Sequence, residues 1–184
     1  MIRYACWLGV AGALSAAAAS AQPGGQSAAQ ASGRAEAEVV VAIRAGPLAD
    51  LSFGSITIGG SGEGSVVVAA DGSPPRYVNA ARSGCSGQTE CEAHRARFAV
   101  SGDADRSYRV ALPGAIVATG RMTGVGLPVT DLAVRSQNDS AASGEGRLDR
   151  TGRDVFFVGG TLRIPPGTRP DVFRAELSVI VNYN

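Results

Sequence analysis

The residues best suited to chemistry in this chain form one small group, Cys85, Cys91 and His94. Structural zinc sites use four ligands with closely paired cysteines, and this group offers three ligands without that pairing. We therefore expect a local disulfide between Cys85 and Cys91, which requires an oxidising compartment, with the metal site as the alternative. So short a ring removes little chain entropy, and the bond would stabilise a loop rather than the fold.

Other kinds of catalysis lack the residues that they require. His94 is the single histidine, the chain has no lysine, and no serine stands in a Gly-x-Ser-x-Gly turn. The glycine-rich run 59–64 leads into the strand-like run Ser65–Val68, whereas a phosphate-binding loop leads into a helix. Asp103 and Asp105 are too few for calcium, which takes six or more oxygens. We expect no enzyme, and no catalytic, cofactor-binding or metal-binding residues.

The amino terminus has the organisation of a secretory signal peptide. Arg3 precedes an apolar stretch from Ala5 to Ala19, and Ala19-Ser20-Ala21 fits the small-x-small pattern of a cleavage site. We expect residues 1–21, with Cys6, to be removed, which places the mature protein in the periplasm, at the cell surface or outside the cell. The stretch is shorter than the about 20 residues of a membrane-spanning helix, so we expect no membrane span after cleavage.

Charge argues against nucleic acid as a partner. All 17 basic residues are arginines, 16 residues are acidic, and removal of Arg3 leaves a formal net charge of zero. Nucleic-acid-binding proteins carry basic patches and a high isoelectric point, and the arginines here are spread along the chain. Neutrality also removes long-range repulsion between copies of the chain, which permits close association.

The pattern of apolar residues predicts an all-β domain. Glycine (25) and proline (9) punctuate short β-branched runs, and no stretch has the spacing of an amphipathic helix. We expect a flexible arm over 22–36 and, over 37–184, a single antiparallel immunoglobulin-like β-sandwich. The expected strands are Ala37–Arg44, Leu51–Ile58, Ser65–Ala70, Ala96–Gly102, Ser107–Pro113, Leu132–Ser136, Val155–Ile164 and Val172–Tyr183.

Two of these runs alternate apolar and polar residues with the period of two typical of half-buried strands. The carboxyl-terminal run gives a candidate strand-pairing face of Phe173, Ala175, Leu177, Val179, Val181 and Tyr183. The amino-terminal run gives a candidate donor or first strand of Ala37, Val39, Val41 and Ile43. Whether this run pairs within its own chain or with another copy stays open, because the link Ala45–Asp50 suits both arrangements.

Several short phrases carry a family resemblance: Leu51–Ile56, Ala96–Gly102, Tyr108–Pro113, Phe157–Leu162 and the closing Val179–Tyr183. Together they resemble the bacterial secreted family called domain of unknown function 4402, a relative of pilus and adhesin β-sandwiches. The resemblance covers about residues 37–184 and implies a fold and a location, since the family has no settled activity. Two segments depart from it, the cysteine loop and the charged stretch Arg121–Arg150.

The resemblance implies a structural or interaction role. In pilus assemblies a subunit that lacks one strand accepts the extended arm of the next subunit. We expect a fimbria-like or adhesin-like protein that acts through strand edges, with further copies, other cell-surface proteins or a periplasmic chaperone as partners. The alternative is a self-contained binding module for carbohydrate or protein, with a pocket lined by Tyr77, Tyr108 or Phe157, because exposed aromatic faces bind sugars.

Overall fold

The computed structural model describes residues 32–60, 62–86, 91–139 and 143–184. Within them all assigned elements are β-strands, every strand pair is antiparallel, and no helix is long and apolar enough to cross a membrane. The predicted all-β, antiparallel fold class is confirmed. The predicted signal peptide, 1–21, and residues 22–31 of the predicted arm lie outside the described residues. A compact unit covers Val39–Asn184.

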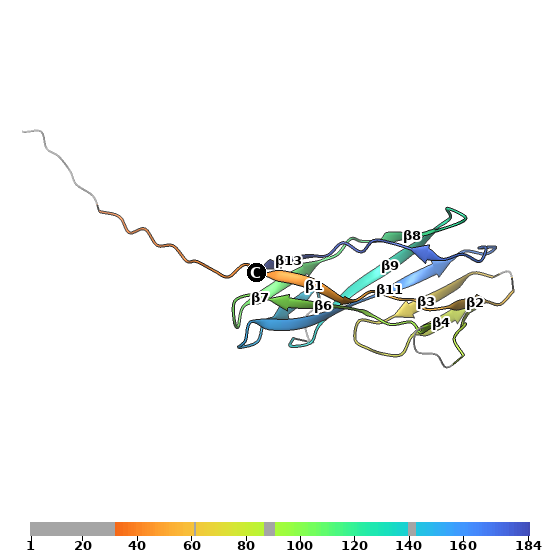
Figure 1. Cartoon of the computed structure of the whole chain (residues 1–184), viewed down its shortest axis with the longest axis horizontal. Helices are drawn as coiled ribbons and strands as arrows, with labels where there is room; N and C mark the ends of the chain where they lie inside the picture. Colours follow the sequence, from red (N-terminus) through yellow and green to blue (C-terminus); the bar gives the residue numbers. More distant parts are fainter. Residues whose placement is uncertain (1–31, 61, 87–90, 140–142) are drawn as a thin grey trace, which may run out of the picture. The chain divides into compact units, whose positions relative to one another are not determined.

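The strands form three sheets that curl into a half-barrel (Figure 1). The largest sheet consists of β1 (Arg44–Ala49), β3 (Gly64–Val68), β4 (Arg76–Asn79), β6 (Ala96–Ser101), β8 (Ile116–Gly120), β9 (Gly126–Ser136), β11 (Arg153–Ile164) and β12 (Phe173–Arg174). Its order is β1-β6-β11-β9-β8-β12, with β3 pairing with β11 and β4. A second sheet has the order β10-β7-β13, made of β7 (Ser107–Ala111), β10 (Glu145–Arg147) and β13 (Ile180–Tyr183). A small third sheet pairs β2 (Ile56–Ile58) with β5 (Ala81–Ser83).

Strand β11 is the centre of the large sheet. One edge pairs with β9, while the other pairs first with β6 and then with β3. The change of partner falls at Gly159, where an added Cβ would overlap the backbone of Val68 and Ala70. Only glycine lets the two chains approach so closely at this point.

The core lies between the large sheet and the β10-β7-β13 sheet. Its largest fully buried side chains are Tyr108 of β7 and Phe156 of β11, whose ring centroids are 6.4 Å apart. Phe98 of β6 stacks on Phe156 at 5.1 Å. Since β-strands alternate their faces, the inward residues of β6 and β11 meet here while their alternate residues face outward.

A buried carboxylate joins the two sheets across this core. Asp154 of β11 is 5% exposed, and its Oδ2 accepts hydrogen bonds from the Tyr108 hydroxyl at 2.8 Å and the Ser136 hydroxyl at 2.5 Å. Its Oδ1 accepts from the backbone N–H of Asn138 at 3.2 Å. Burial first, and then the bond to Asp154, raise the pKa of Tyr108, so the phenol stays protonated and donates.

The hydroxyl of Tyr108 should therefore be required for stability. Replacing Tyr108 with Phe keeps the packing but removes a donor from a buried carboxylate, which should lower the free energy of unfolding by about 1–3 kcal/mol. Urea denaturation would measure the change. The control is Tyr77→Phe, which removes the same hydroxyl from half-buried Tyr77 of β4 and should change the free energy of unfolding less. Equal stability of Tyr108→Phe and the natural protein would contradict the structural role of this hydrogen bond.

Two predicted strands need correction. Residues 37–43 form no strand. Strand β1 begins at Arg44, the last residue of the predicted strand, and continues through the segment expected to be a link, where Pro47 pairs with Phe98 beside a register shift. The predicted terminal strand is divided into β12, which pairs with β8, and β13, which pairs with β7, with no strand over 175–179, so its partner changes past the connection between β7 and β8. That connection contains Pro113, which has no N–H for a ladder hydrogen bond.

Candidate functional site

The large sheet and the β10-β7-β13 sheet both end at open strand edges. Strand β1 lies at one edge of the large sheet and β12 at the other, while β13 lies at the edge of its own sheet. The extended segment Phe173–Tyr183, which we call the carboxyl-terminal segment, thus forms one continuous edge. Unpaired edges are sites where a further strand can add.

Apolar side chains lie along both edges and point into the core. On the carboxyl-terminal segment, four of the predicted apolar residues pack half-buried against the central core cluster and Phe173 packs against another. Ala175 is exposed. The four on the central cluster are Leu177, Val179, Val181 and Tyr183.

Ile43 and Leu51, which flank β1, pack half-buried against the same central cluster. We call the region between β1 and the carboxyl-terminal segment the seam. Figure 1 shows the two chains meeting near the carboxyl terminus and diverging away from it.

The meeting point is a hydrogen-bonded clamp around the backbone of Val41. The Tyr183 hydroxyl donates to the Val41 carbonyl at 2.8 Å and accepts from the backbone N–H of Asp103 at 2.7 Å. The Val41 N–H donates to Oδ1 of Asp103 at 3.1 Å. Arg106 lies 5.0 Å from the Tyr183 ring centroid, and Gly102 leaves no room for a Cβ beside the hydroxyl. One end of the seam is therefore closed.

The predicted apolar face of the amino-terminal run is mostly exposed. Val39 is 96% exposed and Val41 60% exposed, and Ala37 is also exposed, whereas Ile43 is half-buried against the core. Of the two arrangements left open, pairing as a first strand of the same chain is not seen, since residues 37–43 form no strand. The clamp holds the chain at Val41, so its regular pairing starts only at Arg44.

The opposite end of the carboxyl-terminal segment is fixed by Asp171. Its Oδ2 accepts from the Thr123 hydroxyl at 2.7 Å, the Thr123 N–H at 2.8 Å and the Met122 N–H at 3.0 Å. The Arg121 N–H donates to the Val172 carbonyl at 3.0 Å. These bonds tie the β8–β9 turn to the start of β12. The hydroxyl of Thr123, and then the backbone N–H groups, lower the pKa of Asp171 to about 2.

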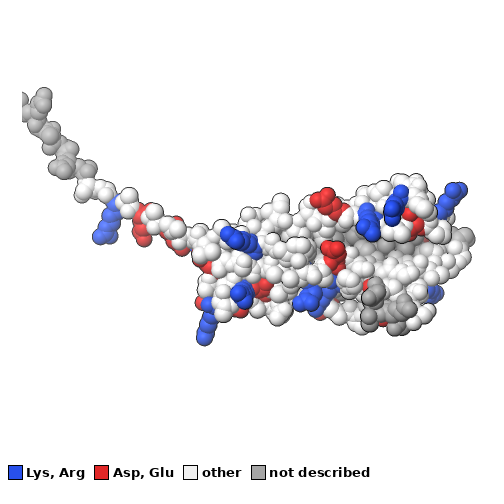
Figure 2. Space-filling view, viewed as in Figure 1, with Lys and Arg blue, Asp and Glu red and all other residues white. Residues whose placement is uncertain are grey.

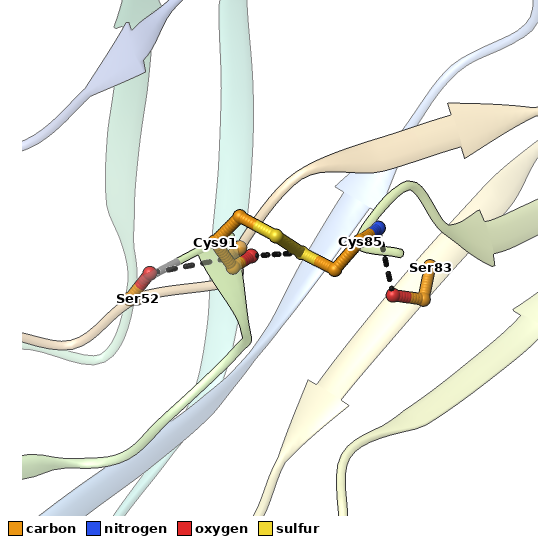
Figure 3. The surroundings of a disulfide bond; sticks show 5 residues. Ser52, Ser83, Cys85 and Cys91 are labelled. Carbon is orange, nitrogen blue, oxygen red and sulfur yellow. Dashed lines mark hydrogen bonds between the residues drawn. A yellow bond between two sulfur atoms is a disulfide. The ribbon is translucent and has the colours of Figure 1, made fainter. Parts of the chain in front are cut away.

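The two cysteines are joined as predicted, with a Cα–Cα distance of 5.7 Å (Figure 3). The Cys91 carbonyl accepts from the Ser55 N–H at 2.9 Å, and the Cys85 N–H donates to the Ser83 hydroxyl at 3.2 Å. The disulfide between Cys85 and Cys91 therefore holds the cysteine loop against residues 52–55. Gly54 has a φ of 71° there, and an added Cβ would approach the Cys91 carbonyl. Residues 87–90 of this loop lie outside the described residues.

The other candidate residues are not brought together. The described residues contain no group of three or more histidine, cysteine or acidic side chains that could hold a metal, and exposed His94 forms an isolated bridge with Ser52. Tyr108 is fully buried, so it lines no sugar site. The Phe157 ring is already in contact with Arg95, whose guanidinium lies 3.5 Å from the ring centroid.

A shallow hollow of about 570 Å³ lies on the outer face of β1, β6 and β11. Arg44, Arg153, Gln137 and Asn138 contribute polar groups to it, and its lining contains no aromatic ring. Because sugar sites use exposed aromatic faces, the hollow does not favour the carbohydrate alternative.

The fold is an all-β, antiparallel half-barrel with open strand edges, and its described residues hold no group of three or more histidine, cysteine or acidic side chains that could bind a metal. Residues 41–183 match the family described as domain of unknown function 4402, and the chain belongs to that family. The match begins and ends at the two residues of the clamp, Val41 and Tyr183. Comparisons with curated proteins and with solved structures give no significant match.

The clamp should protect the Val41 amide from hydrogen exchange. Replacing Asp103 with Ala removes its acceptor, so exchange at Val41 should accelerate by about tenfold or more while the core strands keep their protection. Asp50→Ala, at an exposed position just after β1, is the matched control. Unchanged exchange at Val41 in Asp103→Ala would show that this carboxylate does not hold the chain.

The Asp171 contacts should weaken in acid. The folded-state pKa is about 2, below the ordinary 3.8, so the stabilisation is present above about pH 4 and is lost as the pH falls towards 2. The amide of Thr123, followed by nuclear magnetic resonance, should lose its hydrogen-bonded shift over this range. An Asp171→Asn variant should show no such titration. A midpoint at or above 3.8 would contradict the arrangement.

Proposed function

We propose that this protein is a secreted structural component, fimbria-like or adhesin-like, that associates with further copies of itself by strand addition at the seam. The observation that supports this most is an open edge with apolar side chains beneath it, in a domain that is preceded by an exposed arm. The predicted signal peptide over 1–21 and the disulfide between Cys85 and Cys91 support export to an oxidising compartment.

The donated strand is the arm before Val41. Ile43 packs on its own core, and both backbone groups of Val41 are bound within their own domain, so neither residue is available to another copy. In an extended chain Ala35, Ala37 and Val39 fall on one face. The alternate positions are charged, with Arg34, Glu36 and Glu38. A strand with this pattern could place its small apolar residues against the seam and its charged residues in the solvent.

The direction of the arm follows from the clamp. Because the seam is closed beside Tyr183, the arm of another copy would enter the seam at the Phe173 end. The domain that carries this arm would stay outside the seam. Such an arm runs antiparallel to the carboxyl-terminal segment, the pairing found throughout this fold. Eight extended residues, 33–40, reach about 26 Å, and the carboxyl-terminal segment spans about 36 Å, so the arm covers most of its length.

A second copy is favoured over the same chain as the donor. Folding back into its own seam would require the arm to reverse direction immediately before Val41, at Val39 and Val40. Tight turns use glycine, asparagine, aspartate or proline, and β-branched residues favour extended chain. The two valines therefore disfavour the tight turn that pairing within the same chain would require.

Assembly should depend on the face of the arm that carries Val39. The mature protein, run unboiled on a denaturing gel, should give a ladder of regular multiples, because strand-exchanged polymers dissociate slowly. Val39→Asp places a charge against the apolar seam and should abolish the ladder while the monomer stays soluble. Ser32→Asp, at an exposed position on the other face of the extended arm and before its residues 33–40, is the matched control and should retain it.

Two results would contradict the proposal. A single monomer band from the natural protein would show that the domain is self-contained and would direct the search towards a ligand. Loss of the ladder in both variants would show that charge in the arm, rather than insertion of one face, prevents association.

A further inference from the structure

An exposed apolar patch lies at the entrance of the seam. Met122 in the β8–β9 turn is 83% exposed, Val117 of β8 59%, Val172 57% and Val125 46%. We call these four residues the apolar tip. They come from neighbouring segments. The Arg121 N–H donates to the Val172 carbonyl, and the Val117 side chain lies so close to Gly126 that a Cβ added there would overlap it. Exposed apolar side chains in a contiguous group mark an interaction site more often than single ones do.

The apolar tip is held in place. Asp171 accepts the N–H groups of Met122 and Thr123 as well as the Thr123 hydroxyl, and the Gly120 N–H donates to the Val125 carbonyl at 2.8 Å. A turn with so many hydrogen bonds presents Met122 at low entropic cost, as preorganised binding surfaces do.

The arginines around the apolar tip indicate the kind of segment that it binds. Arg121, Arg169 and Arg174 are exposed on the segments around it, and the carboxylate of Asp171 is engaged by backbone and hydroxyl donors. Figure 2 shows arginine side chains gathered at the end of the molecule that carries β8 and β12. The arm carries the exposed Glu36 shortly before its valines. A basic rim around apolar residues complements that acidic, apolar sequence.

The apolar tip and the clamp lie at opposite ends of the carboxyl-terminal segment, which is about 36 Å long when extended. Asp171 joins the tip to the residues before Phe173, and Tyr183 forms the clamp. An arm that enters the seam at the Phe173 end therefore brings its base, Glu36–Val40, to the tip.

We propose that the apolar tip is the second contact between copies, with Met122 and its neighbours binding the base of the incoming arm of another copy, Glu36–Val40. This inference rests on the proposed function and deepens it. Strand addition in the seam would supply backbone hydrogen bonds, and the tip would fix how far the arm enters and how consecutive domains contact one another.

Cysteine cross-linking tests the contact in the full mature chain. Copies carrying Met122→Cys are mixed with copies carrying Val40→Cys under mild oxidation, with the natural disulfide intact. The tip contact should give covalent dimers of one copy of each kind. The control replaces Met122→Cys with Ser107→Cys, an exposed and conservative change at the clamp end of the fold, and should give at least about tenfold less dimer.

The outcomes separate this inference from strand addition itself. A ladder in the natural protein with equal cross-linking to Met122→Cys and Ser107→Cys would overturn the tip contact and leave strand addition standing. Cross-linking specific to Met122→Cys without any ladder would support the contact and overturn strand addition. Natural protein that stays monomeric and sediments with phosphatidylglycerol vesicles, through Met122, would overturn both and assign the tip to a lipid surface.

Discussion

The carboxylate of Asp154 is the point on which the two main sheets depend. A charged group this deeply buried is stable only when its oxygens are fully hydrogen-bonded, and here donors come from β7, from β9 and from the chain after β9. No single sheet supplies all of them. The network therefore specifies how the sheets face each other, which hydrophobic packing alone does loosely. Phe98 and Phe156 then stack in the space that this arrangement leaves.

The same arrangement produces the open edges. With β11 at the centre and β9, β6 and β3 around it, the described part of the chain has no further strand between β1 and the carboxyl-terminal segment. The half-buried residues of both edges, such as Ile43 and Val179, rest on the core from the two sides of the seam. An edge of this kind either stays short and protected or receives a partner, and strand addition by the arm, as proposed above, would be the second of these outcomes.

Period-two patterns predicted much of this fold from sequence. The inward face of the carboxyl-terminal segment, the central strands β6 and β11, and the pairing of Cys85 with Cys91 follow from local spacing. Strand β1 was not predicted, because Arg44–Ala49 contains glycine and proline and its strand character comes from pairing with β6. Local propensity is overruled there by tertiary contacts.

The candidate site was predicted only in part, for a similar reason. The alternation Ala37–Ile43 indicates a strand, yet the division at Val41 depends on a hydrogen bond from Tyr183, 142 residues further along the chain. From the sequence, Asp103 was considered as a calcium ligand, and its bond to the Val41 N–H depends equally on long-range proximity. The apolar tip also escaped sequence reasoning, since Met122 and Val172 become neighbours only when Asp171 joins their segments.

The meeting of Val41 and Tyr183 also bears on how the chain can be rearranged. The first and last residues of the family's domain are in direct contact, so a short peptide could join them without moving a strand. New ends could then be opened in the surface turn at Asp71–Pro74, between β3 and β4, with every strand pair preserved. Joining Val41 to Tyr183 in this way would make the backbone of the domain a circular chain. The arm would then be an attachment to the domain rather than part of its folding unit.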